Sequence, residues 1–253
     1  MLTHPTLEKL RAMKLTGMTR GLEEQLGNPE IESLTFLERL ALLVDREETA
    51  RSDRSLRTRL KQAKLRVSAC IEDIDYKARR GLDKSVMINL SNLTWIRENR
   101  NIIITGPTGV GKTYLACALA HQACRENYRA QYLRLPRLLQ DLEIAKGDGS
   151  YRKLLAKIDR MDAIILDDWG LSPLNNEQRR DLLEILDDRY GRRSTLITSQ
   201  LPIDKWHAYL DDPTLADAIL DRVTHNAHHL ALEGDSMRKQ KQNLTNTTNT
   251  TTR

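Results

Sequence analysis

The octapeptide GPTGVGKT, residues 106–113, directly follows the apolar run NIIIT and directly precedes the helical stretch YLACALA. It fits the pattern G-x-x-x-x-G-K-[ST], whose glycines let the backbone curl so that its N–H groups face phosphate oxygens. A helix that begins at the end of such a loop adds positive partial charge. A chance match with a purely structural role is the alternative, but the flanking strand and helix argue against it. The motif therefore predicts a phosphate-binding loop between a strand and a helix.

Each part of this loop has an expected role. The Lys112 ammonium can reach the β- and γ-phosphates of a nucleotide, and the Thr113 hydroxyl can bind Mg²⁺. ATP and Mg²⁺ are thus the predicted cofactors. The nucleotide-binding residues are expected to be Gly106, Pro107, Thr108, Gly109, Val110, Gly111, Lys112 and Thr113.

Further apolar, strand-like runs recur after the loop, with helical stretches between them. Strands that alternate with helices indicate a mainly parallel sheet covered on both faces, which is an α/β fold. With the strand before the loop, we predict five strands. Their expected bounds are 101–105, 130–135, 163–167, 194–199 and 228–232.

The chain before residue 90 has a different pattern. From Leu7 to Leu90 the apolar residues recur almost wholly at helical spacing, and Thr35 with Glu38 forms a capping box that starts a long helix. We therefore predict a small all-helical domain over 1–90 and a P-loop domain over 91–240. The polar, low-complexity residues 241–253 cannot bury a core and are expected to form a disordered tail.

The composition and the apolar runs argue against a small disulfide-rich protein and a membrane-spanning protein. The 253 residues are enough for a full core plus a smaller appendage, and the three cysteines have no metal-binding or disulfide spacing. No apolar run approaches the roughly 20 residues of a membrane helix, and we expect a cytoplasmic protein with no membrane partner. The net charge of +5 permits a nucleic-acid partner without requiring one.

The stretch IILDDWG ends the third predicted strand with two adjacent acids. In P-loop proteins the acid at the end of such a strand holds Mg²⁺ beside the loop hydroxyl, which is the role expected of Asp167. Asp168 would then orient or deprotonate the attacking water. Two solvated loop acids are the alternative interpretation. The extra strand between loop and acids favours an ATPase, and a small-molecule kinase would need a lid and an acceptor pocket, neither of which is recognisable.

Two residues further along are candidates for completing the site. Gln200, at the end of the fourth strand, could sense the γ-phosphate or hold the lytic water, although an ordinary turn before a proline explains it nearly as well. Arg222, on the last helix, could project into the nucleotide of a neighbouring subunit and neutralise charge in the transition state. A surface pairing of Arg222 with Asp217 or Asp221 is the alternative, and Arg192 and Arg193 are rivals for the role in trans.

A basic segment near the end of the long helix is the predicted DNA contact. It carries seven basic residues within sixteen positions against one acid. Such a face could neutralise phosphates with little base preference, although basic runs are more often solvated surface. The low aromatic content favours duplex over single-stranded DNA. The expected DNA-binding residues are Arg51, Arg54, Arg57, Lys61 and Lys64.

With LDDWG, TSQLP, HNAHHL and GDSMR in this order after the phosphate loop, the chain resembles the IstB family, the ATPase helper proteins of insertion-sequence transposition. That family belongs with the helicase loader DnaC and the initiator DnaA in the AAA+ class. The resemblance implies an AAA+ core and an ATPase that self-assembles on duplex DNA and recruits or stimulates a partner transposase. It implies that Lys112 and Thr113 bind nucleotide and Mg²⁺, that Asp167 binds Mg²⁺, that Asp168 acts on the water, and that Arg222 acts in trans.

The chain departs from this class in two places. The residues after the last strand are too few for a full helical lid, so a second sensor role for Arg238 is doubtful. Many ATPases of the class carry Glu where this chain has Asp168, and the shorter side chain predicts slow hydrolysis that depends on DNA and a neighbouring subunit. A helicase loader like DnaC and a DNA-coating scaffold that binds ATP without hydrolysing it remain alternatives.

Overall fold

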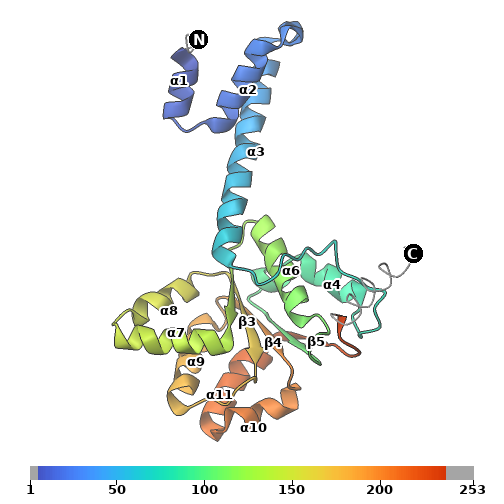
Figure 1. Cartoon of the computed structure of the whole chain (residues 1–253), viewed down its shortest axis with the longest axis vertical. Coiled ribbons are helices and arrows are strands. Elements are labelled where there is room, and N and C mark those ends of the chain that lie inside the picture. The colour runs from blue at the N-terminus through green and yellow to red at the C-terminus, as the bar shows by residue number, and fades with distance from the viewer. Residues whose placement is uncertain (1–4, 238–253) are drawn as a thin grey trace, which may run out of the picture. The chain divides into compact units, whose positions relative to one another are not determined.

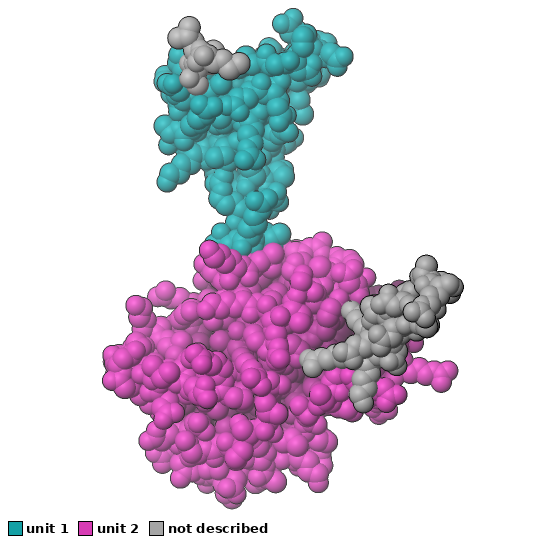
Figure 2. Space-filling model, viewed as in Figure 1, with its two compact units in different colours: residues 1–58 teal, residues 59–253 magenta. Residues whose placement is uncertain are grey.

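The computed structural model describes residues 5–237, and its chain divides into two compact units (Figure 2). Unit 1 is Met1–Thr58 and unit 2 is Arg59–Arg253. This division falls well before residue 90, where the sequence pattern predicts the end of the helical domain. The predicted tail over 241–253 and the candidate sensor Arg238 lie outside the described residues.

Unit 1 is helical, as its sequence pattern predicts. The long helix α3 starts at the predicted capping box, because the Thr35 N–H donates to Glu38 Oε2 at 2.8 Å and the Glu38 N–H donates to Thr35 Oγ1 at 3.4 Å. Helix α3 crosses the division between the units and ends at Ala63. The elements are α1 (Pro5–Ala12), α2 (Thr16–Gly27), the 3₁₀ helix η1 (Pro29–Ser33) and α3 (Phe36–Ala63) (Figure 1).

Helices α2 and α3 approach each other closely at Gly17. A Cβ atom at this position would lie 2.4 Å from the carbonyl oxygen of Arg46, so only glycine allows the contact. The Gly17 N–H donates to the buried Glu47 carboxylate at 2.7 Å, and this acid also accepts from the Met18 N–H. Glu47 thereby satisfies N–H groups at the start of α2 that have no partner within the helix.

Unit 2 contains the predicted five-stranded sheet, in the order β2-β3-β4-β1-β5. Every neighbouring pair is parallel, which confirms the predicted α/β class. The predicted strand positions agree with the structure to within a residue or two at each end. The strands are β1 (Asn101–Thr105), β2 (Ala130–Arg134), β3 (Ala163–Trp169), β4 (Ser194–Ser199) and β5 (Ala227–Ala231).

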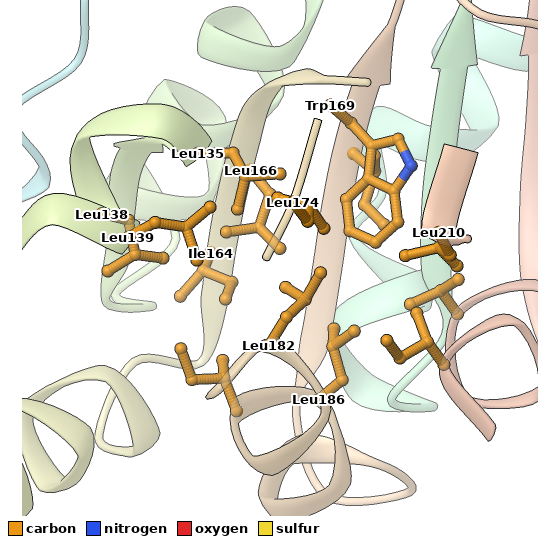
Figure 3. Close-up of a cluster of buried hydrophobic side chains, with 14 of the residues drawn as sticks. Leu135, Leu138, Leu139, Ile164, Leu166, Trp169, Leu174, Leu182, Leu186 and Leu210 are labelled. Carbon is orange, nitrogen blue, oxygen red and sulfur yellow. The ribbon is translucent and has the colours of Figure 1, made fainter. Parts of the chain in front are cut away.

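Helices cover the sheet because its strands are apolar on both sides. Ile103, Ile164 and Leu166 face a core with α7 to α11, in which Leu182 and Trp169 are also buried (Figure 3). Helix α6 packs against β1 to β4. The helices of this unit are α4 (Lys84–Ser91), α5 (Thr94–Arg97), α6 (Lys112–Arg125), α7 (Leu135–Gly147), α8 (Tyr151–Asp159), α9 (Asn176–Arg189), η2 (Ile203–Lys205), α10 (Trp206–Leu210) and α11 (Pro213–Thr224).

The predicted helical pattern is wrong between α3 and α4. Residues 65–83 form no helix, and Lys64 ends α3 with a left-handed φ of 49°. Ala69 and Ile74 are buried, so tertiary contacts rather than a helical face use the apolar residues of this segment. Within residues 5–237, no helix is long and apolar enough to cross a membrane.

Candidate active site

The sheet order brings the predicted site residues to one edge. Strand β4 lies between β1 and β3, and the carboxyl ends of all five parallel strands meet at the same edge. Ligands of open α/β sheets bind outside these ends. The phosphate loop follows β1, the acid pair ends β3, and Thr198 and Gln200 lie at the end of β4.

The phosphate loop curls around the side chain of its lysine. Lys112 Nζ donates to the carbonyl oxygens of Gly106 at 2.7 Å and Pro107 at 2.8 Å, and Lys112 is 9 % exposed. Gly109 and Gly111 have φ values of 86° and 105°, which favour glycine over residues with a Cβ. This cradle of backbone N–H groups at the start of α6 fits the phosphates of a nucleotide.

A buried arginine that was not predicted as a site residue forms a hydrogen bond with the backbone of the loop. Arg80 is 4 % exposed, and its Nη1 donates to the carbonyl oxygen of Val110 at 3.2 Å. A Cβ on Gly111 would lie 2.6 Å from this nitrogen, so the glycine also makes room for Arg80. Burial lowers the pKa of the Arg80 guanidinium, opposed by the charge of Asp75.

Thr113 and Asp167 meet as the sequence predicts. Thr113 Oγ1 donates to Asp167 Oδ1 at 2.9 Å, and the Asp167 residue is fully buried. Hydroxyl and carboxylate oxygens suit Mg²⁺, which takes one or two carboxylates and completes its shell with phosphate and water. Among residues 5–237, no cluster of three or more His, Cys, Asp or Glu could hold a metal.

Asp168 reaches the same site because β3 is bulged. Side chains alternate across a regular strand, so two adjacent acids would point to opposite faces. Here the register with β4 shifts between Leu166 and Trp169, and Asp168 takes a left-handed φ of 65°. Its N–H points to Thr198 Oγ1 at 3.4 Å. A bulge of this kind redirects a side chain next to a functional site.

Three further residues surround the acids, and none of them was predicted as a site residue. Tyr132 donates to Asp167 Oδ2 at 2.5 Å, and Arg134 Nε donates to Asp168 Oδ2 at 2.6 Å. Arg66 Nη1 lies 3.4 Å from Asp167 Oδ2 and 3.7 Å from Asp168 Oδ2. Burial, and then the hydrogen bond to Asp167, raise the pKa of the Tyr132 hydroxyl, so it stays a hydrogen-bond donor.

Two residues at the end of β4 make contacts with different partners. Gln200 Oε1 accepts from Thr108 Oγ1 at 2.6 Å, so Gln200 contacts the phosphate loop. Thr198 is the β4 residue that reaches the acids, since its hydroxyl donates to Asp167 Oδ1. The residue predicted from the sequence at this strand end was Gln200.

Arg222 lies near the amino ends of the strands, whereas the phosphate loop of its own chain lies at their carboxyl ends. Asn101 Nδ2, on the first residue of β1, donates to the Arg222 carbonyl oxygen at 3.0 Å, whereas the loop follows the last residue of that strand. Five strand residues span about 13 Å. The guanidinium pairs with Asp187 at 2.9 Å and Asp221 at 2.8 Å and lies over the Tyr190 ring. It lines a cavity of about 300 Å³ that also includes the rival Arg193.

The predicted DNA-binding residues are exposed. Arg51 forms an ion pair with Glu47 at 2.8 Å, and Arg54 donates to Thr16 Oγ1. Lys64 follows the end of α3 at the left-handed turn. The exposed members of this set are Arg51, Arg54, Arg57, Lys61 and Lys64.

Several solved structures have a similar fold. The crystal structure of DnaI aligns with a TM-score of 0.57 at 22 % identity, covering 66 % of this chain and 92 % of that one. The AMPPCP-bound DnaA of Aquifex aeolicus aligns with a TM-score of 0.58 at 17 % identity, covering 75 % of this chain and 58 % of that one. Together with the parallel sheet and the phosphate loop, these likenesses show an α/β P-loop fold similar to that of DnaI and DnaA.

Sequence comparison adds the family. The model described as "IstB-like ATP binding protein" matches residues 8–245. A putative insertion sequence ATP-binding protein of Sinorhizobium fredii is 52 % identical over 241 residues, covering 95 % of this chain and 98 % of that protein. The putative ATP-binding protein of insertion sequence IS21 from Pseudomonas aeruginosa is 32 % identical over 229 residues, covering 90 % of this chain and 86 % of that protein. The chain belongs to the IstB-like family of insertion-sequence ATP-binding proteins, which confirms the resemblance found in the sequence.

Proposed function

We propose that this protein hydrolyses ATP with Mg²⁺ and uses the nucleotide to control its assembly on duplex DNA during transposition. The observation that carries the proposal is the meeting of Thr113, Asp167 and Asp168 beside the phosphate loop, with Thr113 Oγ1 2.9 Å from Asp167 Oδ1. Lys112 would bind the β- and γ-phosphates, and Thr113 and Asp167 would hold the metal. Bound Mg²⁺ would neutralise charge on the phosphates.

Asp168 is the proposed acceptor of the proton from the attacking water. Its carboxylate is 21 % exposed, and its Oδ2 accepts from Arg134 Nε at 2.6 Å, so the arginine holds the carboxylate in this orientation. The side chain is also one methylene shorter than the glutamate common in the class. Both features support slow basal hydrolysis, since general-base catalysis requires hydrogen-bond distance to the water.

The position of Arg222 supports a role in the site of a neighbouring copy. Arg222 lies at the amino ends of the strands, about a strand length from the phosphate loop of its own chain, so it cannot contact a nucleotide bound there. In a homo-oligomer it would leave Asp187 and Asp221 and stabilise the γ-phosphate of the adjacent subunit. Bound ATP would thereby order the assembly, and hydrolysis would release it.

The exposed basic residues around the end of α3 support contact with the phosphates of duplex DNA. Such contacts carry little sequence preference and weaken as salt rises.

The names of the relatives associate the family with insertion sequences, so the partner we propose is a transposase. A helicase loader is the second candidate, because the DnaC helicase loader has a similar fold with a TM-score of 0.54. A scaffold that binds ATP without hydrolysis is the third.

Assembly tests the proposal. The full chain, mixed with duplex DNA and a non-hydrolysable ATP analogue, is expected to sediment as large complexes that do not form when either component is omitted. Arg222→Ala should bind the analogue normally but remain small, because its neighbour's γ-phosphate would lose its contact. Arg192→Ala and Arg193→Ala are the matched controls, and both should assemble. Assembly by Arg222→Ala with failure of Arg193→Ala would contradict the assignment, and monomers throughout would contradict the proposed function.

A further inference from the structure

Arg66 belongs to unit 2 and is fixed there by the residues around it. It follows the left-handed turn at Lys64 that ends α3. On either side of it, Ala63 and Ala69 are buried with 0 % and 2 % exposure. Arg59 Nε donates to the carbonyl oxygen of Cys124 on α6 at 2.8 Å. The segment that carries Arg66 is therefore packed within unit 2, which also holds the phosphate loop.

The Arg66 guanidinium lies between the two acids and Tyr132. Its Nη1 lies 3.4 Å from Asp167 Oδ2, 3.4 Å from Tyr132 Oη and 3.7 Å from Asp168 Oδ2. Asp167 has a side-chain exposure of 1 %, and a buried carboxylate without compensation is strongly unfavourable. The hydrogen bond to Tyr132, followed by the charges of both acids, raises the pKa of Arg66, so the guanidinium remains charged.

The two oxygens of Asp167 serve different partners. Oδ1 accepts from Thr113, on the side where the proposed metal would join the hydroxyl and the carboxylate. Oδ2 accepts from Tyr132 and Arg66. A divalent cation on this carboxylate would repel the guanidinium, which lies only a few ångströms away. The carboxylate cannot bind both cations without a loss of binding energy.

We propose that Arg66 is a positioning residue that holds Asp167 and Asp168 in the metal-free site and competes with Mg²⁺ for the Asp167 carboxylate. Binding of Mg²⁺ with nucleotide then releases Arg66 from the acid pair. This inference rests on the proposed function, because it requires the metal at Thr113 and Asp167. Arg66 has a side-chain exposure of 44 %, so solvent screens the pair and the competition is moderate.

The Mg²⁺ dependence of nucleotide binding tests this competition without any turnover. A fluorescent, non-hydrolysable ATP analogue is titrated into the full chain at a series of Mg²⁺ concentrations. Arg66→Gln should lower the Mg²⁺ concentration needed for half-maximal binding by about two- to fivefold, the range expected for an exposed ion pair. Arg66→Lys keeps the charge and should stay close to the parent chain. Arg152→Gln, an exposed charge change on α8, is the matched control and should leave the Mg²⁺ dependence unchanged.

Each remaining outcome overturns the inference. An unchanged or raised Mg²⁺ requirement in Arg66→Gln would mean that the arginine does not oppose the metal. A shift in Arg66→Lys as large as that in Arg66→Gln would remove charge as the cause. Thermal unfolding midpoints of the three variants verify that all are folded. Failure of the proposed function is distinguishable, because in that case the parent chain itself would bind the analogue without any Mg²⁺ dependence.

Discussion

Lys112→Ala is expected to weaken ATP binding by at least about 100-fold, because it removes charge-assisted hydrogen bonds to the β- and γ-phosphates that contribute about 1.5–3 kcal/mol each. Isothermal titration of the purified chain with ATP and Mg²⁺ measures the effect. The phosphate loop should keep its shape in the variant, since glycine φ values and the packing of α6 against the sheet set that shape.

The control for this variant is Lys153→Ala on α8, which removes one exposed lysine from the same unit. It should bind ATP as the parent chain does. The thermal unfolding midpoint without nucleotide separates lost binding from lost folding, because Lys112 Nζ also bonds two loop carbonyls. Affinity within about fivefold of the parent chain would contradict the assignment of Lys112 to the phosphates.

Asp168→Asn is expected to lower the rate of ATP hydrolysis by about 10²- to 10⁴-fold, the usual contribution of a general base, while ATP binding is retained. Asparagine tolerates a left-handed backbone, so the φ of 65° at this position should persist. Its amide oxygen can still accept from Arg134. The substitution thus removes the proton acceptor with little change in the bulge. Single-turnover hydrolysis measures the rate, and complexes on DNA should persist longer than those of the parent chain.

Asp204→Asn is the control for the loss of one acid, since Asp204 lies in η2 and has a side-chain exposure of 70 %. It should hydrolyse ATP at the parent rate. Normal hydrolysis by Asp168→Asn would show that another group handles the water. In that case Thr198, whose hydroxyl lies between Asp167 and the Asp168 N–H, would be the next residue to replace.

Local signals were sufficient to predict the P-loop unit. The strand NIIIT, the loop and the start of α6 are consecutive in the chain, so the motif alone fixes their order. The other strands were predictable because each is a short apolar run bounded by polar residues or turns. The segment 65–83 was not, because its apolar residues recur at a helix-like spacing although Ala69 and Ile74 are buried in tertiary contacts outside any helix.

The acid site was only partly predictable, since its completion depends on the sheet order. A phosphate loop implies a nearby acid at a strand end, which is why the pairing of Thr113 with Asp167 was expected. The contacts of Tyr132 and Arg134 with the acids arise because β2 is the neighbour of β3 at the edge of the sheet. Nothing in the one-dimensional pattern indicates that adjacency. Arg66 is the last of the seven basic residues in the run at the end of the long helix, and its turn toward the acids was not predictable because it depends on the end of α3.

The bulge at Asp168 could not be predicted from the sequence. From alternation alone, Asp167 and Asp168 would lie on opposite faces, so two acids in one site were expected only from the chemistry of P-loop proteins. The left-handed φ and the shifted register with β4 explain how the chain meets that need. No residue in IILDDWG predicts the bulge; Gly170, with a φ of 79°, follows the end of β3.

The ATP turnover of the full chain, measured with and without duplex DNA under otherwise equal conditions, tests the central claim most directly. We predict slow turnover by the chain alone and a clear increase with duplex DNA, because assembly would add Arg222 of a neighbour and draw Asp168 from Arg134. The increase should fall steeply between about 50 and 200 mM salt, as phosphate contacts weaken. Fast turnover by an isolated monomer, unaffected by duplex DNA, would contradict the account.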